Sequence, residues 1–144
     1  MLEMSKIYNL TTEDDVDFHL GMVLTRDRSK KSITISQPGY TEEMLATYNI
    51  PLDVTSHPLT PMSDAPRNLP SETNKLLDKK GIEDYQSKVG SLLYLANQTR
   101  PDILYAVNMH SRYTKSPTQE DILAVHRIFL YFAFRRRYCF ICNC

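Results

Sequence analysis

The feature that most constrains the fold is the spacing of apolar residues between Glu83 and Gln98. Apolar side chains recur there every three or four positions, which places them on one face of a helix. They are Tyr85, Val89, Leu92, Leu93 and Ala96. Thr99-Arg100-Pro101-Asp102 ends this helix, because a proline lacks the N–H that a continuing helix needs. The same proline suits the first position of a new helix, and Asp102 adds favourable negative charge there.

Two further helices are predicted after this break. The first runs from Ile103 to Tyr113, with Ile103, Val107 and Ser111 on one side and Leu104 beside them. Ser116-Pro117-Thr118 ends it, and Thr118 with Asp121 three residues later resembles a capping box. The last helix spans Ile122 to Phe132, and its apolar face holds Ile122, Val125, Phe129 and Phe132. Gly90 costs a helix up to about 1 kcal/mol relative to alanine, so we expect it to permit a close helix contact.

The first quarter of the chain reads as a β-hairpin. Asp17 to Thr25 is apolar enough for a strand, and Ser32 to Ser36 alternates polar and apolar residues. The charged run Arg26 to Lys31 lies between them as the turn. Such a polar tip can bind a phosphate backbone or can simply be solvated, and the sequence leaves both readings open.

A short helix is predicted from Tyr40 to Tyr48. Thr41 is the expected N-cap, and Glu42 and Glu43 favour the first turn. The apolar stripe consists of Tyr40, Met44, Leu45 and Tyr48. We expect this stripe to belong to the core.

A proline-rich stretch separates these two parts. Five prolines fall between Pro51 and Pro70, which disfavours helix and predicts an extended linker, and Ser71 to Lys80 is at most weakly helical. The sequence therefore predicts a mainly α, α+β chain with four regions. These are the hairpin and short helix (1–50), the linker (51–82), a three-helix region (83–134) and a divergent tail (135–144).

The overall charge does not favour a free-standing nucleic-acid binder. Lysines and arginines together number 17, as do acids, so the formal net charge is zero. The cations are nevertheless concentrated at the hairpin tip and at Arg135 to Arg137. Aromatic residues interleave the second cluster, which reads either as a nucleic-acid patch or as the charged end of a helix.

Composition also bounds the cellular setting. No apolar run approaches the roughly 20 residues of a spanning helix, and no signal peptide is visible. Cys139, Cys142 and Cys144 are odd in number and clustered, so they predict no disulfide framework. They supply at most half of a zinc site, and the alternative is a run of unpaired thiols. We expect no membrane association and an intracellular location, in the cytoplasm or nucleus.

The sequence offers no convincing catalytic carboxylate pair, which a polymerase needs to hold metal ions. Glu42-Glu43, Glu83-Asp84 and Glu120-Asp121 all lie at predicted helix starts, where the helix dipole explains them. Asp14-Asp15 is not part of a Tyr-x-Asp-Asp pattern, and it does not lie in the turn of a predicted hairpin. We therefore predict no catalytic residue and no cofactor.

Three segments of the chain resemble copia-type retrotransposon reverse transcriptases, in the order found in that family. The first is D-F-H-L-G-M (17–22) with I-S-Q-P-G-Y-T-E-E-M-L (35–45). The second runs Y-Q-S-K-V-G-S-L-L-Y-L-A-N-Q-T-R-P-D-I-L-Y-A-V (85–107), and the third runs S-R-Y-T-K-S-P-T-Q-E-D-I-L-A-V-H-R-I-F-L-Y (111–131). The resemblance extends from Asp17 to Phe132 and departs from the family pattern after it.

The resemblance implies the part of the polymerase that follows the catalytic aspartates: the primer-grip hairpin, the thumb and the connection. Its implied role is to hold primer–template RNA or DNA, with the remaining polymerase segments as further partners. Mg²⁺ would serve the parent enzyme, but its ligands are missing here, so no polymerase activity is expected of this chain by itself. The alternatives are a repurposed protein-interaction module and a decayed element product without function.

Nucleic-acid contacts are expected from two groups of residues. By motif position, Phe18, Leu20 and Gly21 fall in the primer grip, and the hairpin tip and the T-R-P-D string supply cations. The cations are Arg26, Arg28, Lys30, Lys31 and Arg100. For Arg100 a structural role is an equal alternative, in which it forms an ion pair with Asp102 at the helix junction.

Overall fold

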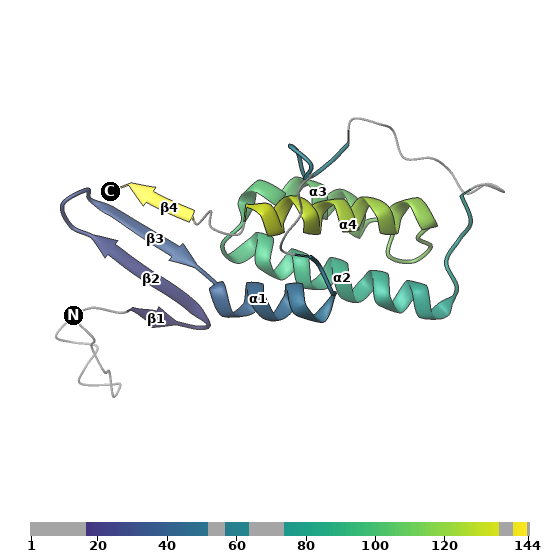
Figure 1. Cartoon of the computed structure of the whole chain (residues 1–144), viewed down its shortest axis with the longest axis horizontal. Helices are drawn as coiled ribbons and strands as arrows, with labels where there is room; N and C mark the ends of the chain where they lie inside the picture. The colour runs from purple at the N-terminus through teal and green to yellow at the C-terminus, as the bar shows by residue number, and fades with distance from the viewer. Residues whose placement is uncertain (1–16, 52–56, 64–73, 136–139, 144) are drawn as a thin grey trace, which may run out of the picture.

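A small antiparallel sheet lies beside a group of helices in the computed structural model of the chain, which describes residues 17–51, 57–63, 74–135 and 140–143 (Figure 1). The strands are β1 (Phe18–His19), β2 (Met22–Asp27), β3 (Ser32–Ser36) and β4 (Phe140–Asn143). The helices are α1 (Pro38–Thr47), α2 (Lys79–Gln98), a 3-10 turn (Pro101–Ile103), α3 (Leu104–Ser111) and α4 (Gln119–Phe134). The predicted class, mainly α within α+β, is confirmed.

The sheet is built in the order β1-β2-β3-β4, with all neighbours antiparallel. The β2–β3 hairpin is the predicted one, and Thr25 lies opposite Thr34. The prediction of a single strand over Asp17 to Thr25 is wrong. Leu20 and Gly21 have φ values of 49° and 80°, so the chain turns back on itself and pairs β1 with β2. Glycine adopts such a backbone freely, which is why the reversal occurs at this pair.

The end of the chain supplies a strand that sequence analysis treated only as a divergent tail. β4 pairs with β3, and Thr34 lies opposite Ile141. A four-residue strand gives too short a pattern to be recognised from periodicity. Pairing between residues so far apart in the sequence is decided only when the helices bring the two ends together.

The hydrophobic core lies among the helices. Its buried members are Met44, Leu45, Ile50, Tyr85, Val89, Leu92, Leu95, Ala96, Ile103, Ala106, Val107, Val125, Ile128, Phe129, Tyr131, Phe132 and Ala133. Most of the predicted apolar faces are confirmed by this set. Among the described side chains of β1, β2 and β3, none is buried. These three strands therefore extend from the helical core without contributing buried side chains to it (Figure 1).

Helix α1 begins two residues earlier than predicted. Its N-cap is Gln37, and Pro38 occupies the first turn, where its missing N–H costs nothing. Thr41 is therefore not the N-cap; it lies inside the helix, and its Oγ1 donates to the Gln37 carbonyl at 2.7 Å. Glu42 and Glu43 lie beyond the first turn for the same reason. The predicted apolar stripe is confirmed, since its residues are buried or packed against the core.

Helix α2 begins at Lys79, four residues before the predicted start. Asp78 caps it by accepting a hydrogen bond from the Gly81 N–H at 2.9 Å. The weak helix predicted for residues 71–80 is wrong over 74–78, where the chain is extended and Leu76 bridges to Thr118. The expectation for Gly90 is also wrong: the residue is exposed, and a Cβ placed there meets no atom within 4 Å.

The predicted capping box at the start of α4 is confirmed and is reinforced from outside. The Thr118 Oγ1 accepts from the Asp121 N–H at 3.4 Å, and the Asp121 carboxylate accepts from the Thr118 N–H at 2.8 Å. The next free N–H groups are satisfied by the extended segment before α2. Gln119 donates to the Lys75 carbonyl at 3.0 Å, and the Glu120 N–H donates to Asn74 Oδ1 at 3.3 Å.

Replacing Thr118 by alanine is expected to lower the free energy of unfolding by about 1–2 kcal/mol, because a fully buried cap is lost. Urea denaturation monitored by circular dichroism measures the change. Thr47→Ala is the matched control, since its hydroxyl is exposed and bonds only within its own helix. An equal loss in both variants would contradict a special role for the cap.

The described part of the proline-rich linker, residues 57–63, forms no helix or strand. It lies against α4, where the Arg127 guanidinium donates to the Thr60 carbonyl and hydroxyl, both at 3.3 Å. The His57 ring stacks on Phe134 with the ring centroids 3.2 Å apart. The rest of the linker prediction, at 52–56 and 64–70, falls outside the described residues.

Candidate nucleic-acid interface

The tip of the β2–β3 hairpin is organised by Asp27. Its carboxylate Oδ1 accepts from the Ser29 N–H at 3.0 Å, the Ser29 hydroxyl at 2.6 Å and the Lys30 N–H at 3.0 Å. The hydrogen bond from the Ser29 hydroxyl is the main cause of a pKa of Asp27 below its ordinary value. This role was not predicted from the sequence, although an aspartate in a turn commonly accepts a hydrogen bond from the backbone N–H two residues later.

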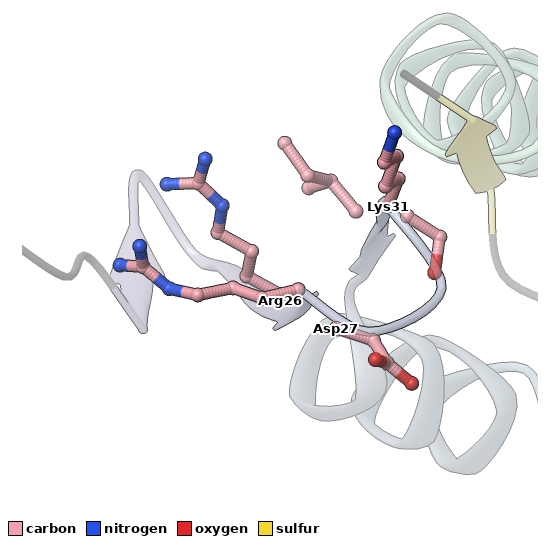
Figure 2. A pocket seen from close by; sticks show the side chains of 6 residues that line it. Arg26, Asp27 and Lys31 are labelled. Carbon is pink, nitrogen blue, oxygen red and sulfur yellow. The ribbon is translucent and has the colours of Figure 1, made fainter.

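Three of the four cations predicted at the tip share one surface. Arg26, Arg28 and Lys31 line an open hollow of about 480 Å³, together with Asp27, Ser32 and Ile33. Figure 2 shows the Arg26 side chain extending away from Asp27, with Lys31 on the far side of the turn. The cations therefore outnumber the one carboxylate of this surface.

The pairing of these cations decides what the tip can bind. Lys30 Nζ lies 3.5 Å from Asp27 Oδ2 and forms an exposed ion pair, which adds little stability. Within the described part of the chain, the side chains of Arg26 and Lys31 make no hydrogen bond or ion pair. At least two positive charges at the tip are thus available to an anion from solution.

The turn between β1 and β2 presents the residues assigned to the primer grip. Phe18 is 65% exposed and Leu20 is 75% exposed, so both apolar side chains face solvent. A leucine at φ 49° is strained by roughly 1–2 kcal/mol relative to ordinary backbone. Gly21, beside it, adopts its φ of 80° without that cost.

This turn and the basic tip lie at opposite ends of β2 (Figure 1). A strand rises about 3.3 Å per residue, so the six residues of β2 separate them by about 16 Å. That distance corresponds to about five base steps at 3.4 Å per nucleotide of one strand. A nucleic-acid strand that runs along β2 could therefore contact both features.

Arg100 lies away from this surface and is only 4% exposed. Its Nε and Nη2 donate to the two Asp102 carboxylate oxygens at 2.8 and 2.7 Å, and its Nη1 donates to the Arg135 carbonyl at 3.1 Å. Its guanidinium also lies 4.6 Å from the centre of the Phe132 ring. Arg100 therefore forms the ion pair with Asp102 that was the alternative to a nucleic-acid contact, and it is not part of the proposed interface.

Asp102 completes this junction. Burial acts to raise the pKa of Asp102, but the hydrogen bond and the positive charge of Arg100 outweigh it. The pKa of Asp102 therefore lies below its ordinary value. This pair ties the α2–α3 junction to the end of α4.

Several other predicted features fall partly or wholly outside the described residues. These are Asp14-Asp15, Arg136, Arg137, Cys139 and Cys144. Of the second basic cluster, Arg135 is described, and its guanidinium lies 5.0 Å from the centre of the Tyr131 ring. Within the described ranges no three His, Cys, Asp or Glu side chains gather closely enough to hold a metal ion. No helix in those ranges is long and apolar enough to cross a membrane.

Comparison with known proteins identifies the kind of sequence to which this chain is similar. No family model and no solved structure matches it. It is 34% identical over 131 residues to the retrovirus-related Pol polyprotein from transposon RE2 of Arabidopsis thaliana, which covers 90% of this chain and 8% of the polyprotein. It is 30% identical over 130 residues to the retrovirus-related Pol polyprotein from transposon TNT 1-94 of Nicotiana tabacum, and this alignment covers 90% of this chain and 10% of that polyprotein.

A transposon Ty5-1 protein of Saccharomyces cerevisiae is 29% identical over 137 residues, which covers 95% of this chain and 42% of the yeast protein. The chain thus spans a tenth or less of the plant polyproteins and under half of the yeast protein. Nearly its whole length is similar to one segment of the retrovirus-related Pol polyproteins encoded by transposons.

Proposed function

We propose that the chain corresponds to the part of a copia-type reverse transcriptase that follows the catalytic aspartates, and that it holds primer–template nucleic acid through its hairpin tip. The observation that carries the proposal is the group of cations at residues 26–31, where Arg26 and Lys31 lack a partner within the described chain. The similarity to transposon Pol polyproteins supplies the context for this reading.

The tip is suited to the nucleic-acid backbone more than to the bases. Arginine and lysine neutralise phosphates and release counterions, which gives affinity without sequence preference. Asp27 holds the turn closed, which fixes the backbone positions from which these charged side chains extend. The exposed Phe18 and Leu20, about five base steps away, offer an apolar contact to the same strand.

The proposed role is to position nucleic acid, and we assign no catalytic step to this chain. The parent polymerases use Mg²⁺ held by paired carboxylates, and one acid in each of two adjacent pairs of this chain is already bonded within the protein. Asp121 is buried in the capping box, and Asp84 pairs with Lys88 at 2.7 Å. Glu42 and Glu43 do not indicate a metal site either, because no group of three possible metal ligands occurs in the described part of the chain.

The test compares two double variants of equal charge change. Arg26→Gln with Lys31→Gln removes the unpaired cations of the tip, whereas Lys79→Gln with Lys80→Gln removes two exposed cations at the start of α2. Fluorescence anisotropy with a labelled primer–template duplex measures the affinity as a function of salt. We expect the tip variant to bind roughly tenfold more weakly and to lose about two from the salt slope.

The control variant is expected to bind almost as well as the natural chain. Absence of binding by the natural chain at low salt would refute the proposal, as would equal losses in the two variants. Circular dichroism of both variants verifies that the fold is retained.

A second candidate function is a protein-interaction module, and the exposed Phe18 and Leu20 together with the uncovered sheet favour it. In this case the partner is the remainder of the polymerase. Size-exclusion chromatography with the polymerase segment that contains the catalytic aspartates distinguishes the two functions. Complex formation that is lost in Leu20→Asn, without any duplex binding, would favour the module.

A further inference from the structure

Ser29 is an exposed residue of the basic tip. Arginines precede it by three and by one position, in Arg26-Asp27-Arg28-Ser29, and Lys30 and Lys31 follow it. The residue is exposed, and its hydroxyl makes one hydrogen bond in the structure, to Asp27 Oδ1 at 2.6 Å. The hydroxyl is therefore within reach of another protein approaching the tip.

The two arginines before Ser29 can be recognised together. Both line the same hollow, so a single acidic groove can contact both guanidinium groups. Carboxylates pair with guanidinium groups through two parallel hydrogen bonds, which gives both strength and direction. Charge patterns around a hydroxyl are the features by which protein kinases select their substrates.

We propose that Ser29 is a phosphorylation site for an arginine-directed protein kinase, and that its phosphate switches off nucleic-acid binding by the tip. The second half of this statement rests on the proposed function above. The first half concerns the chain and the kinase alone.

The transfer uses a nucleoside triphosphate with its Mg²⁺, both brought by the kinase. The Ser29 Oγ attacks the γ-phosphorus, and the bond from that phosphorus to the β,γ-bridging oxygen breaks. A new Oγ–P bond forms, the nucleoside diphosphate leaves, and the hydroxyl proton passes to the kinase's catalytic base. Access of the kinase requires the turn to open, and the bonds it must break, from Ser29 and Lys30 to Asp27, join exposed groups.

The phosphate would change the tip in two ways. It removes the hydroxyl donor that Asp27 accepts and places a charge of about −1.5 to −2 beside that carboxylate. It also offers strong acceptor oxygens to the neighbouring cations, which then pair within the protein. Arg26 and Lys31 would no longer be available to the phosphates of a duplex.

Ser32 provides an internal comparison. It also follows two cations, Lys30 and Lys31, but it lies in β3, paired with Asp27 on one side and Asn143 on the other. Ser32 is only partly buried and lines the hollow, but its backbone is paired with a strand on each side, so a kinase can draw it into an extended substrate conformation less readily than Ser29. The structure therefore predicts phosphorylation at Ser29 in preference to Ser32.

The experiment treats the full chain with Mg-ATP and the catalytic subunit of the cyclic-AMP-dependent protein kinase, and maps phosphate by mass spectrometry. We expect phosphate on Ser29, none at this position in Ser29→Ala, and unchanged modification of Ser29 in Ser32→Ala. Arg26→Gln is expected to slow the reaction at least about tenfold, because a charge-assisted pair is lost. Lys79→Gln, which removes a distant cation, is expected to leave the rate unchanged.

Anisotropy with the same primer–template duplex then tests the switch. The phosphorylated chain is expected to bind about tenfold more weakly, with a salt slope smaller by roughly two. Kinase treatment of Ser29→Ala is expected to change nothing.

The phosphorylation site and its effect on binding are refuted by different results. The site is refuted if Ser29 stays unmodified while the kinase phosphorylates a reference peptide, and the switch is refuted if the phosphorylated chain binds equally well. Failure of the untreated chain to bind the duplex overturns the proposed function and the switch together. The phosphorylation result, read by mass, stands or falls independently of binding.

Discussion

Replacing Phe129 by alanine is expected to lower the free energy of unfolding by about 3–5 kcal/mol, because a fully buried aromatic ring is lost and a cavity remains. The ring lies in the middle of α4, and its centroid is 5.2 Å from that of Tyr48. Tyr48 caps α1 and also bonds through its hydroxyl to the Ser87 and Ser91 hydroxyls, both at 2.9 Å. Phe129 thus packs on the residue that joins α1 to α2.

Urea denaturation of the natural chain and the variant measures this loss. Small domains are stable by only about 5–15 kcal/mol, so the change would remove a large fraction of the total. Leu123→Ala is the matched control on the same helix, since Leu123 is 66% exposed. A loss below about 1 kcal/mol for Phe129→Ala would contradict the described core.

Replacing Arg100 by leucine is expected to lower the free energy of unfolding by about 2–4 kcal/mol. The variant loses two hydrogen bonds to Asp102, one to the Arg135 carbonyl and the contact with the Phe132 ring. Leucine keeps apolar volume in the buried space but satisfies none of these acceptors. Lys88→Leu is the control, because its ion pair with Asp84 is partly exposed and joins residues of one helix.

The same junction predicts a pH dependence. The pKa of Asp102 is lowered in the folded chain, so its contribution is present above the unfolded pKa of about 3.9 and is lost as pH falls through the folded pKa. The contribution is roughly 1 kcal/mol, because the Asp102 side chain is 37% exposed and screened by solvent. We expect natural chain and Arg100→Leu to differ less in unfolding free energy at pH 3 than at pH 7.

A difference that stays constant from pH 7 to pH 3 would show that Asp102 does not contribute through its charge. Asp102→Asn separates this effect from packing, since it removes the carboxylate and keeps the side-chain volume. Its destabilisation is expected at pH 7 and is expected to shrink below pH 4.

The residues of the candidate interface show which of its features can be predicted from the sequence alone. The charged run from Arg26 to Lys31 identifies the hairpin tip, because charges cannot be buried in a small sheet without partners. The availability of individual cations could not be predicted, since it depends on where each side chain points. Arg100, in contrast to the cations of the tip, is not available to a ligand: it is the one of eight proposed contact residues that is buried and bonded within the protein.

The helices of the second half were determined by the sequence itself. The apolar spacing of residues 83–98, the proline at 101 and the capping box at Thr118 are all local signals, and each acts over a few residues. Local sterics and hydrogen bonding are sufficient to specify such elements.

Only the tertiary structure decided the remaining features. The extended segment 74–78 is not helical, because its backbone groups bond to the start of α4. Strand β4 exists because β3 offers an edge that lies near the end of α4 in space. Arg100 is buried because Phe132 and the Arg135 carbonyl meet it across the core. In each case the deciding partner is distant in the sequence, so no local pattern of charge or hydrophobicity can reveal it.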